Sequence, residues 1–389
     1  VNTILEMAEY KKTGSCKVLV VTGCMAQRYK NEIIEEVPEV DAVLGTTSYG
    51  DILKAIREAM EGKHFQEFKD IDYLPEKLGK RVLTTGGHFG YLKIAEGCDK
   101  HCTYCIIPKL RGKFRSVPME RLVTQAKEMA EEGVKELILV AQETTVYGTD
   151  IYGKKSLHIL LKELCKIKGI RWIRVLYCYP EEIYDELIQT MKEEKKICHY
   201  LDLPIQHASD RILKRMGRRT TQAELVEIVN KLRREIPDIV LRTTLISGFP
   251  GETQEDHEEL MSFVDEMEFD RLGVFTYSPE EDTPAATMPD QVAEEVKEAR
   301  RDEIMELQQE ISYDKGTDRI GQELLVMIEG KVADESAYIG RTYGDAPKVD
   351  GYIFVQTGEL LMTGDFAKVR VTGALEYDLI GELADEYTE

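Results

Sequence analysis

Between residues 90 and 277, short apolar runs alternate with longer segments in which apolar residues recur at helical spacing. Six such runs and the segments between them predict repeated strand–helix units and a parallel sheet, curled into an open (βα)6 barrel. A flat doubly wound sheet is the alternative, but no GxGxxG pattern follows its first strand. The predicted strands are 90–95, 136–141, 171–177, 200–204, 239–246 and 271–277, and the predicted helices are 118–132, 156–167, 181–195, 209–235 (broken) and 253–267.

The pattern changes after a long charged helix predicted at 290–314. Beyond Gly316, short strand-like runs are separated by turn residues, which predicts a small antiparallel barrel of the OB-like kind. Such barrels often bind RNA. Residues 315–389, however, hold seven Lys/Arg and fifteen Asp/Glu, and a net charge of −8 is a poor surface for phosphates. The predicted strands are 323–330, 337–343, 351–356, 366–373 and 376–383.

The amino-terminal part reads as the remnant of an α/β domain, with a buried-type strand at 17–22 between helices at 1–11 and 49–61. The first residues resemble the middle of a helix without a cap, so we expect a fragment or a misassigned start. Charged, Gly-containing residues at 62–88 form a plausible linker. The expected domains are residues 1–80, 81–314 and 315–389.

Composition narrows the class of protein. The chain has 389 residues, of which 42% are hydrophobic and 32% charged, as in globular proteins. It has no apolar run of about 20 residues for a membrane span and no secretory signal, so the cytoplasm is expected. The net charge of −21, from 51 basic and 72 acidic residues, disfavours a nucleic acid partner and suits a basic protein.

Three of the eight cysteines lie within eight positions, at Cys98, Cys102 and Cys105. This CxxxCxxC triplet follows the first strand of the predicted barrel, at the end where functional groups gather. Three thiolates are one short of a closed structural zinc site, whereas a cubane iron–sulfur cluster on three cysteines leaves one iron open. A zinc loop completed by His101 or Cys178 is the alternative.

The segment from Glu96 to Ser116, EGCDKHCTYCIIPKLRGKFRS, resembles the radical S-adenosylmethionine (SAM) methylthiotransferases. The resemblance implies a [4Fe-4S] cluster on Cys98, Cys102 and Cys105, whose open iron chelates SAM, and reductive cleavage of SAM to a hydrogen-abstracting radical. It also implies a second [4Fe-4S] cluster, for which Cys24 in Gly23–Arg28 matches the third ligand. The first two ligands normally lie upstream of Val1, so formation of this cluster is in doubt. The carboxyl-terminal barrel resembles a TRAM domain.

The run Gln206-His207-Ala208-Ser209-Asp210 is similar to the RimO branch of this family. That branch methylthiolates the β carbon of an aspartate in the twelfth small-subunit ribosomal protein. The segments 340–351 and 376–382 are also similar to that branch, and an acidic surface suits a basic ribosomal protein. The branch that modifies tRNA adenosine is the first alternative, and a non-enzymatic, zinc-stabilised scaffold that binds a partner is the second. We expect a monomer that accepts electrons from a flavodoxin- or ferredoxin-like protein.

Candidate cofactor-binding residues lie in the cysteine motif and at strand ends, and no residue is assigned a catalytic role. Arg174 and Tyr177 are three positions apart, so only one of them is expected to line the barrel. Glu252 and Thr253 are expected to cap the following helix. His207 either orients substrate or is a hydrogen-bonded structural group. The cofactor-binding candidates are Tyr104, Gln142, Arg174, Gln206 and Gly248.

Overall fold

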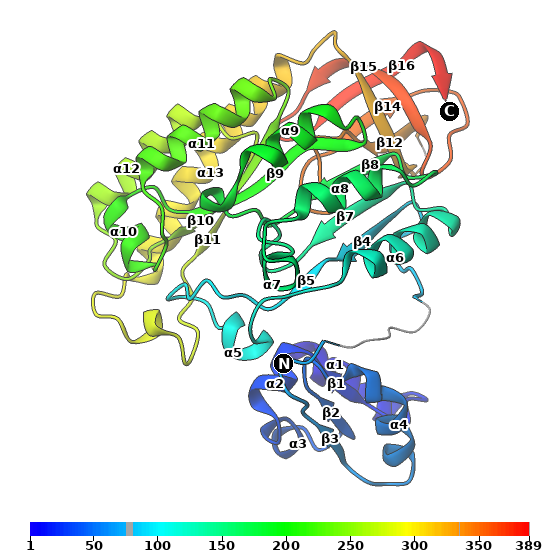
Figure 1. Cartoon of the computed structure of the whole chain (residues 1–389), viewed down its shortest axis with the longest axis vertical. Coiled ribbons are helices and arrows are strands. Elements are labelled where there is room, and N and C mark those ends of the chain that lie inside the picture. Colours follow the sequence, from blue (N-terminus) through cyan, green and yellow to red (C-terminus); the bar gives the residue numbers. More distant parts are fainter. Residues whose placement is uncertain (75–80, 334, 389) are drawn as a thin grey trace. The chain divides into compact units, whose positions relative to one another are not determined.

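A computed structural model describes residues 1–74, 81–333 and 335–388 of the chain (Figure 1). Its contacts divide the chain into two compact units. Unit 1 contains residues 1–82, 96–101 and 105–115, and unit 2 contains residues 83–95, 102–104 and 116–389. The expected boundary after residue 80 falls on the stretch 75–80, which lies outside the described residues. The division into three domains therefore stays a prediction.

Unit 1 is a small α/β structure with a parallel three-stranded sheet in the order β1-β2-β3. Its core is formed by short apolar side chains, among them Val21, Ala26 and Val43, which pack between the sheet and the helices. Only the first of its three strands was predicted. The elements are α1 (Asn2–Thr13), β1 (Val20–Thr22), α2 (Cys24–Tyr29), α3 (Glu32–Glu36), β2 (Ala42–Leu44), α4 (Ile52–Met60), β3 (Phe65–Glu67) and α5 (Ile107–Arg111).

Unit 2 is built on a six-stranded sheet in the order β11-β10-β9-β8-β7-β4, in which every neighbouring pair is parallel. The edge strands β11 and β4 do not pair with each other, so the sheet is open. All six predicted strands are present. They are β4 (Phe89–Lys93), β7 (Glu136–Val140), β8 (Trp172–Val175), β9 (Ile197–Gln206), β10 (Val240–Ser247) and β11 (Arg271–Thr276); two-residue strands β5 (Ala95–Glu96) and β6 (Arg115–Ser116) flank the cysteine loop.

Amphipathic helices connect these strands and cover the outer face of the sheet (Figure 1). Apart from the short α7, in which no residue is buried, the helices between the strands bury apolar side chains, as α8 does with Leu157, Leu160, Leu161 and Leu164. The helix predicted at 209–235 is broken as expected. The helices are α6 (Met119–Glu131), α7 (Thr149–Tyr152), α8 (Leu157–Cys165), α9 (Asp185–Glu193), α10 (Asp210–Arg215), α11 (Gln222–Glu235), α12 (Gln254–Met267) and α13 (Glu294–Thr317).

The carboxyl-terminal strands form a closed five-stranded barrel in the order β12-β13-β14-β16-β15. The barrel was predicted as antiparallel, and all its pairs are antiparallel except β14 with β16. Val326, Ile328, Ile353 and Val369 are among the side chains that fill its interior. The strands are β12 (Glu323–Lys331), β13 (Ala337–Arg341), β14 (Ile353–Gln356), β15 (Phe366–Ala374) and β16 (Leu379–Thr388).

The sheet and the barrel share one apolar core. Trp172 of β8 meets Phe366 of β15 edge to face, with ring centroids 4.9 Å apart. This pair belongs to a cluster that takes residues from five strands of the sheet and from the barrel. The cluster, called the shared core below, comprises Phe89, Ile138, Trp172, Leu176, Cys198, Tyr200, Val240, Met327, Ala346 and Phe366.

A chain of buried charges runs alongside the shared core. Glu136 has no solvent exposure and accepts hydrogen bonds from Arg174 Nε at 2.8 Å and from Arg341 Nη2 at 2.7 Å. Arg341 also donates to Glu329 at 2.6 Å, and Glu329 lies 2.9 Å from His88 Nε2. Burial alone would raise the pKa of Glu136, but the two guanidinium groups outweigh it and lower that pKa. The sheet and the barrel are therefore held together by charges that are paired away from water.

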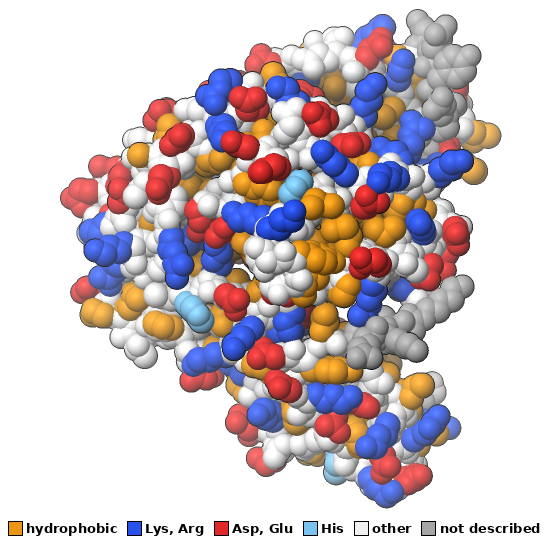
Figure 2. Space-filling view, in the orientation of Figure 1, with side chains coloured by type: hydrophobic (Ala, Val, Ile, Leu, Met, Phe, Trp, Pro, Cys, Tyr) orange, Lys and Arg blue, Asp and Glu red, His pale blue; other side chains and the backbone are white. Residues whose placement is uncertain are grey.

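The surface shows no segregation of the negative charge on the face drawn in Figure 2, where acidic and basic side chains are interspersed. No helix of the described residues is long and apolar enough to span a membrane.

We predict that Glu136→Gln destabilises the protein strongly, because it removes the buried counter-charge of Arg174 and one of the two carboxylates bound to Arg341. Loss of one partner of a buried ion pair typically costs about 3–5 kcal/mol. Chemical denaturation measures the change in the free energy of unfolding. Glu323→Gln is the control, since Glu323 pairs with Arg370 at a position where both side chains are 46% exposed. Equal effects of the two substitutions would contradict the prediction.

The stability difference between wild type and Glu136→Gln is expected to shrink in acid. The folded-state pKa of Glu136 is lowered from the ordinary value of 4.5, so its stabilisation is complete above that pH. It is lost as the pH falls through the lowered value. Denaturation midpoints of both proteins at pH 7, 5, 4 and 3 test this, and a difference that stays constant across the series would contradict it.

Candidate cofactor site

The carboxyl ends of the parallel strands bring several predicted site residues to one edge of the sheet. Gln142 follows β7, Tyr177 follows β8, Gln206 ends β9 and Gly248 follows β10. These four strands are consecutive neighbours in the sheet. Gln142, Gln206 and Gly248 therefore lie along the same edge, where parallel α/β folds bind their ligands.

The backbone at this edge adopts conformations that side chains seldom take. Tyr177 has φ +59°, Gln206 has φ +72° and Gly248 has φ +69°. A non-glycine residue in this region costs about 1–3 kcal/mol, and such residues cluster at functional sites. At Gly248 a Cβ would come within 2.2 Å of Lys297 Cγ, so only glycine fits there.

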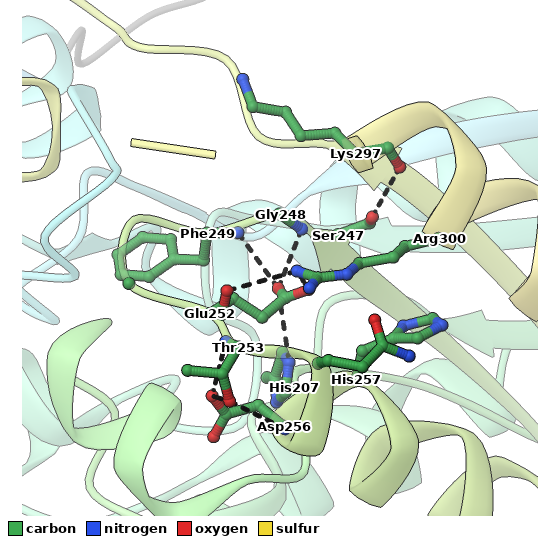
Figure 3. A network of polar contacts seen from close by, with 12 residues as sticks. His207, Ser247, Gly248, Phe249, Glu252, Thr253, Asp256, His257, Lys297 and Arg300 are labelled. Atoms are coloured by element: carbon green, nitrogen blue, oxygen red, sulfur yellow. Dashed lines mark hydrogen bonds and ion pairs between the residues drawn. The ribbon is translucent and has the colours of Figure 1, made fainter. Parts of the chain in front are cut away.

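The loop after β10 is closed by the carboxylate of Glu252 (Figure 3). Its Oε2 accepts hydrogen bonds from the backbone N–H groups of Gly248 at 2.8 Å and Phe249 at 3.1 Å, and its Oε1 accepts one from Arg300 at 2.8 Å. Burial alone would raise the pKa of Glu252, but contacts with His207, Arg300 and the N–H of Phe249 outweigh it and lower the pKa. An ionised, buried carboxylate thus fixes the shape of the loop.

The expectation that Glu252 and Thr253 cap the next helix is correct for only one of them. Thr253 is the N-cap of α12 and forms a reciprocal capping box with Asp256. Glu252 points instead into its own loop, because two N–H groups and a guanidinium converge there.

His207 is fully buried; its Nδ1 accepts a hydrogen bond from the backbone N–H of Ser209 at 3.0 Å, and its Nε2 lies 3.5 Å from the Glu252 carboxylate. These contacts make His207 a structural group.

Tyr104, from the cysteine motif, packs against the loop after β10. Its ring meets that of Phe249 edge to face with centroids 6.3 Å apart, in a small apolar cluster that also contains Tyr277. The neighbouring residue Thr103 donates through its N–H to Met216 O at 2.9 Å and through its hydroxyl to Arg215 O at 2.8 Å. The segment 102–104 is therefore anchored in unit 2, next to the Gly248 loop.

Cys102 is buried in unit 2, and its Sγ lies 3.7 Å from Tyr179 Oη. The guanidinium of Arg218 lies over the Tyr179 ring, 4.2 Å from the ring centroid. The Arg218 side chain is only 1% exposed. A phenol and a buried cation thus lie beside the middle cysteine of the motif.

Cys98 and Cys105 belong to unit 1, where Cys98 is buried and Cys105 half-buried. Lys100 donates its backbone N–H to Cys98 Sγ at 3.4 Å. Among the described residues, no three His, Cys, Asp or Glu side chains converge closely enough to hold a single metal ion. The donor set of the loop is nevertheless that of an iron–sulfur cluster, with three cysteines within eight positions.

Cys24, the predicted ligand of a second cluster, is half-buried at the first position of α2 in unit 1. Arg111 of α5 donates through Nε to Cys24 Sγ at 3.1 Å, and its Nη1 lies 3.4 Å from Glu96. A positively charged side chain therefore lies beside the sulfur of this cysteine.

Arg174 lies away from the edge that carries the other candidates. It is fully buried, bonded to Glu136 and to the backbone oxygen of Tyr343, and stacked over Tyr200. These contacts give no support to a role in cofactor binding, and we do not carry Arg174 into the proposed site. Of the pair Arg174 and Tyr177, Tyr177 remains at the edge and is 49% exposed.

The remaining cysteines have structural surroundings. Cys178, considered above as a fourth zinc ligand, is fully buried with Thr144 Oγ1 at 3.4 Å from its sulfur, and burial raises its pKa. Burial also raises the pKa of Cys165 and that of Cys198 to about 12. Cys16 donates to Val18 O at 3.5 Å. Thiols of this kind are inert packing groups.

Sequence reasoning missed the roles of Tyr179, Arg218 and Glu252. Tyr179 and Arg218 lie 77 and 116 positions beyond Cys102, so only the fold brings them beside its sulfur. Glu252 stood in a recognised motif, but the motif did not reveal which N–H groups its side chain would meet.

Comparison with known proteins gives three family matches: the radical SAM superfamily over residues 92–264, the TRAM domain over residues 320–384, and the uncharacterised family UPF0004 over residues 1–45. These agree with the barrel enzyme and the small carboxyl-terminal barrel expected from the sequence.

Curated relatives match nearly the whole chain. A protein of Lachnoclostridium phytofermentans named ribosomal protein uS12 methylthiotransferase RimO is 65% identical over 98% of this chain and 87% of its own length. A protein of the same name from Clostridium perfringens is 53% identical over 99% of this chain and 86% of its own length. Another from Clostridioides difficile is 49% identical over 99% of this chain and 87% of its own length. Identity at this level over this length shows that the chain belongs to the RimO family of radical SAM methylthiotransferases.

Proposed function

We propose that this protein adds a methylthio group to the β carbon of an aspartate in ribosomal protein uS12, using SAM and iron–sulfur chemistry. The observation that carries the proposal is the 65% identity, over nearly the full chain, to a protein named for that reaction. The cysteine motif supports it independently, because its residues 102–104 are anchored in unit 2 beside the strand ends that carry the other candidates.

Cys98, Cys102 and Cys105 would hold a [4Fe-4S] cluster, which together with SAM supplies the electron and the hydrogen-abstracting radical. The protein's own contribution is positioning. Tyr104 packs against Phe249, and Glu252 holds the Gly248 loop in one shape. Gln142 and Gln206 present amide groups at the same edge, where they can donate hydrogen bonds to SAM.

We further propose Cys24 as one ligand of an auxiliary [4Fe-4S] cluster, with Arg111 beside it. The other partners follow from the reaction: a basic ribosomal protein as substrate and a flavodoxin- or ferredoxin-like electron donor. We propose that the enzyme acts as a monomer.

The rival substrate is an adenosine in tRNA. Two observations favour the ribosomal protein: the Gln206-His207 pair in the sequence, and the net charge of −8 on residues 315–389. An acidic barrel repels RNA phosphates and attracts a basic protein.

We predict that the anaerobically reconstituted and reduced protein converts SAM to 5′-deoxyadenosine and methylthiolates uS12 but not tRNA. Mass spectrometry of uS12 and of digested tRNA, together with chromatography of the nucleosides, measures all three products. Cys102→Ala should abolish 5′-deoxyadenosine, while Cys165→Ala, a cysteine outside the motif, should leave it unchanged. Modified tRNA with unmodified uS12 would favour the rival, and absence of 5′-deoxyadenosine would refute the proposal.

We also predict that Glu252→Gln weakens SAM binding and lowers the melting temperature. The substitution leaves Arg300 without its buried counter-charge and loosens the Gly248 loop, with an expected cost of about 3–5 kcal/mol. Calorimetric titration of the reconstituted protein with SAM gives the affinity. Glu259→Gln, at an exposed position on the following helix α12, serves as control. Unchanged SAM affinity in the Glu252 variant would remove the loop from the proposed site.

A further inference from the structure

The surroundings of Cys102 hold two groups that the reaction as described does not use. We propose that Tyr179 and Arg218 are positioning residues that stabilise negative charge on the Cys102 sulfur and thereby raise the reduction potential of the cluster bound there. The proposal rests on the proposed function, namely that Cys98, Cys102 and Cys105 hold a cluster.

The position of Cys102 relative to these groups is fixed by its neighbour. Thr103 is fixed by three hydrogen bonds. It donates to the backbone oxygens of Met216 and Arg215, and its own carbonyl oxygen accepts from the N–H of Ala285 at 2.9 Å. Arg218 follows Met216 by two residues. The same turn therefore carries Arg218 and anchors the cysteine loop.

Tyr179 is placed to donate a hydrogen bond to the sulfur. Its Oη lies 3.7 Å from Cys102 Sγ, within hydrogen-bonding range for sulfur. A thiolate has no hydrogen, so in the metal-binding form of Cys102 the phenol must be the donor. The backbone of Tyr179 is itself tied to Thr145 Oγ1 at 3.2 Å, which holds the ring against this end of the sheet.

Arg218 supplies a buried positive charge. Its Nη2 donates to Pro204 O at 3.1 Å and lies 3.5 Å from the Glu181 carboxylate. Its Nε and Nη1, in contrast, have no hydrogen-bond partner within the described ranges. Buried charges of this kind are normally compensated. Thiolate-bound clusters are anionic, and a cluster on Cys102 would place such a charge next to Tyr179, whose ring Arg218 covers.

Both contacts act on the reduction step in the same direction. Reduction adds one electron to the cluster and makes it more negative, so a hydrogen bond to sulfur and a nearby cation favour the reduced form. Removing either group should make the cluster harder to reduce by the external electron donor.

Redox titration of the reconstituted full chain tests this, with the midpoint potential followed by absorbance and electron paramagnetic resonance. All proteins carry Cys24→Ala, so that only the cluster of the cysteine loop is titrated. Tyr179→Phe and Arg218→Gln should each shift the midpoint to more negative potential, and Arg218→Lys should recover part of the shift. Tyr184→Phe is the matched control, because its hydroxyl is bonded to His158 and to no cysteine.

Midpoints of Tyr179→Phe and Arg218→Gln that equal the parent value would overturn the proposal. A folded Tyr179→Phe protein that fails to retain iron would also overturn it, because Tyr179 would then hold the cluster and not tune it. Should Arg218→Gln not fold, Tyr179→Phe and Arg218→Lys decide. A parent protein that assembles no reducible cluster would refute the proposed function itself, which is a different result.

Discussion

The pairing of Glu136 with Arg174 and Arg341 is the interaction on which the architecture of unit 2 depends. One carboxylate on the central sheet neutralises a guanidinium from the neighbouring strand and another from the barrel, all without solvent exposure. Such a group is costly to bury unless every charge is paired, so the contact specifies one docking geometry more sharply than the apolar shared core does. With the barrel fixed there, the opposite, carboxyl edge of the sheet stays available for chemistry.

That edge uses buried polar contacts for a different purpose. The Glu252 carboxylate accepts hydrogen bonds from two N–H groups and a guanidinium, so contacts within the protein hold the Gly248 loop in one shape. Phe249 of this loop then supports Tyr104, which is part of the cysteine motif. A site that is rigid before its cofactor arrives loses less entropy on binding, and it holds reactive groups in place more accurately.

The surroundings of Cys102 extend this logic from shape to charge. The phenol of Tyr179 and the guanidinium of Arg218 come from separate segments of unit 2. Burying either group costs free energy unless a partner compensates it. Their placement makes sense beside an anionic sulfur. Arg111 of unit 1 likewise places a cation next to Cys24, which we propose as a cluster ligand.

The sequence by itself determined the order of the strands and helices, the small closing barrel and the cysteine motif, because periodicity and close spacing are local properties of the chain. It also identified the residues that end each strand, and so the edge where Gln142, Gln206 and Gly248 meet. Only the tertiary structure decided which long side chains serve the site and which serve the core. Arg174, expected to bind a cofactor, is bonded to Glu136 and to the backbone of Tyr343. Arg218, which no sequence pattern indicated, lies over the ring of Tyr179, whose hydroxyl is next to Cys102. The physical reason is that the partner of a buried charge is chosen by packing between segments distant in sequence, and no local pattern encodes that choice.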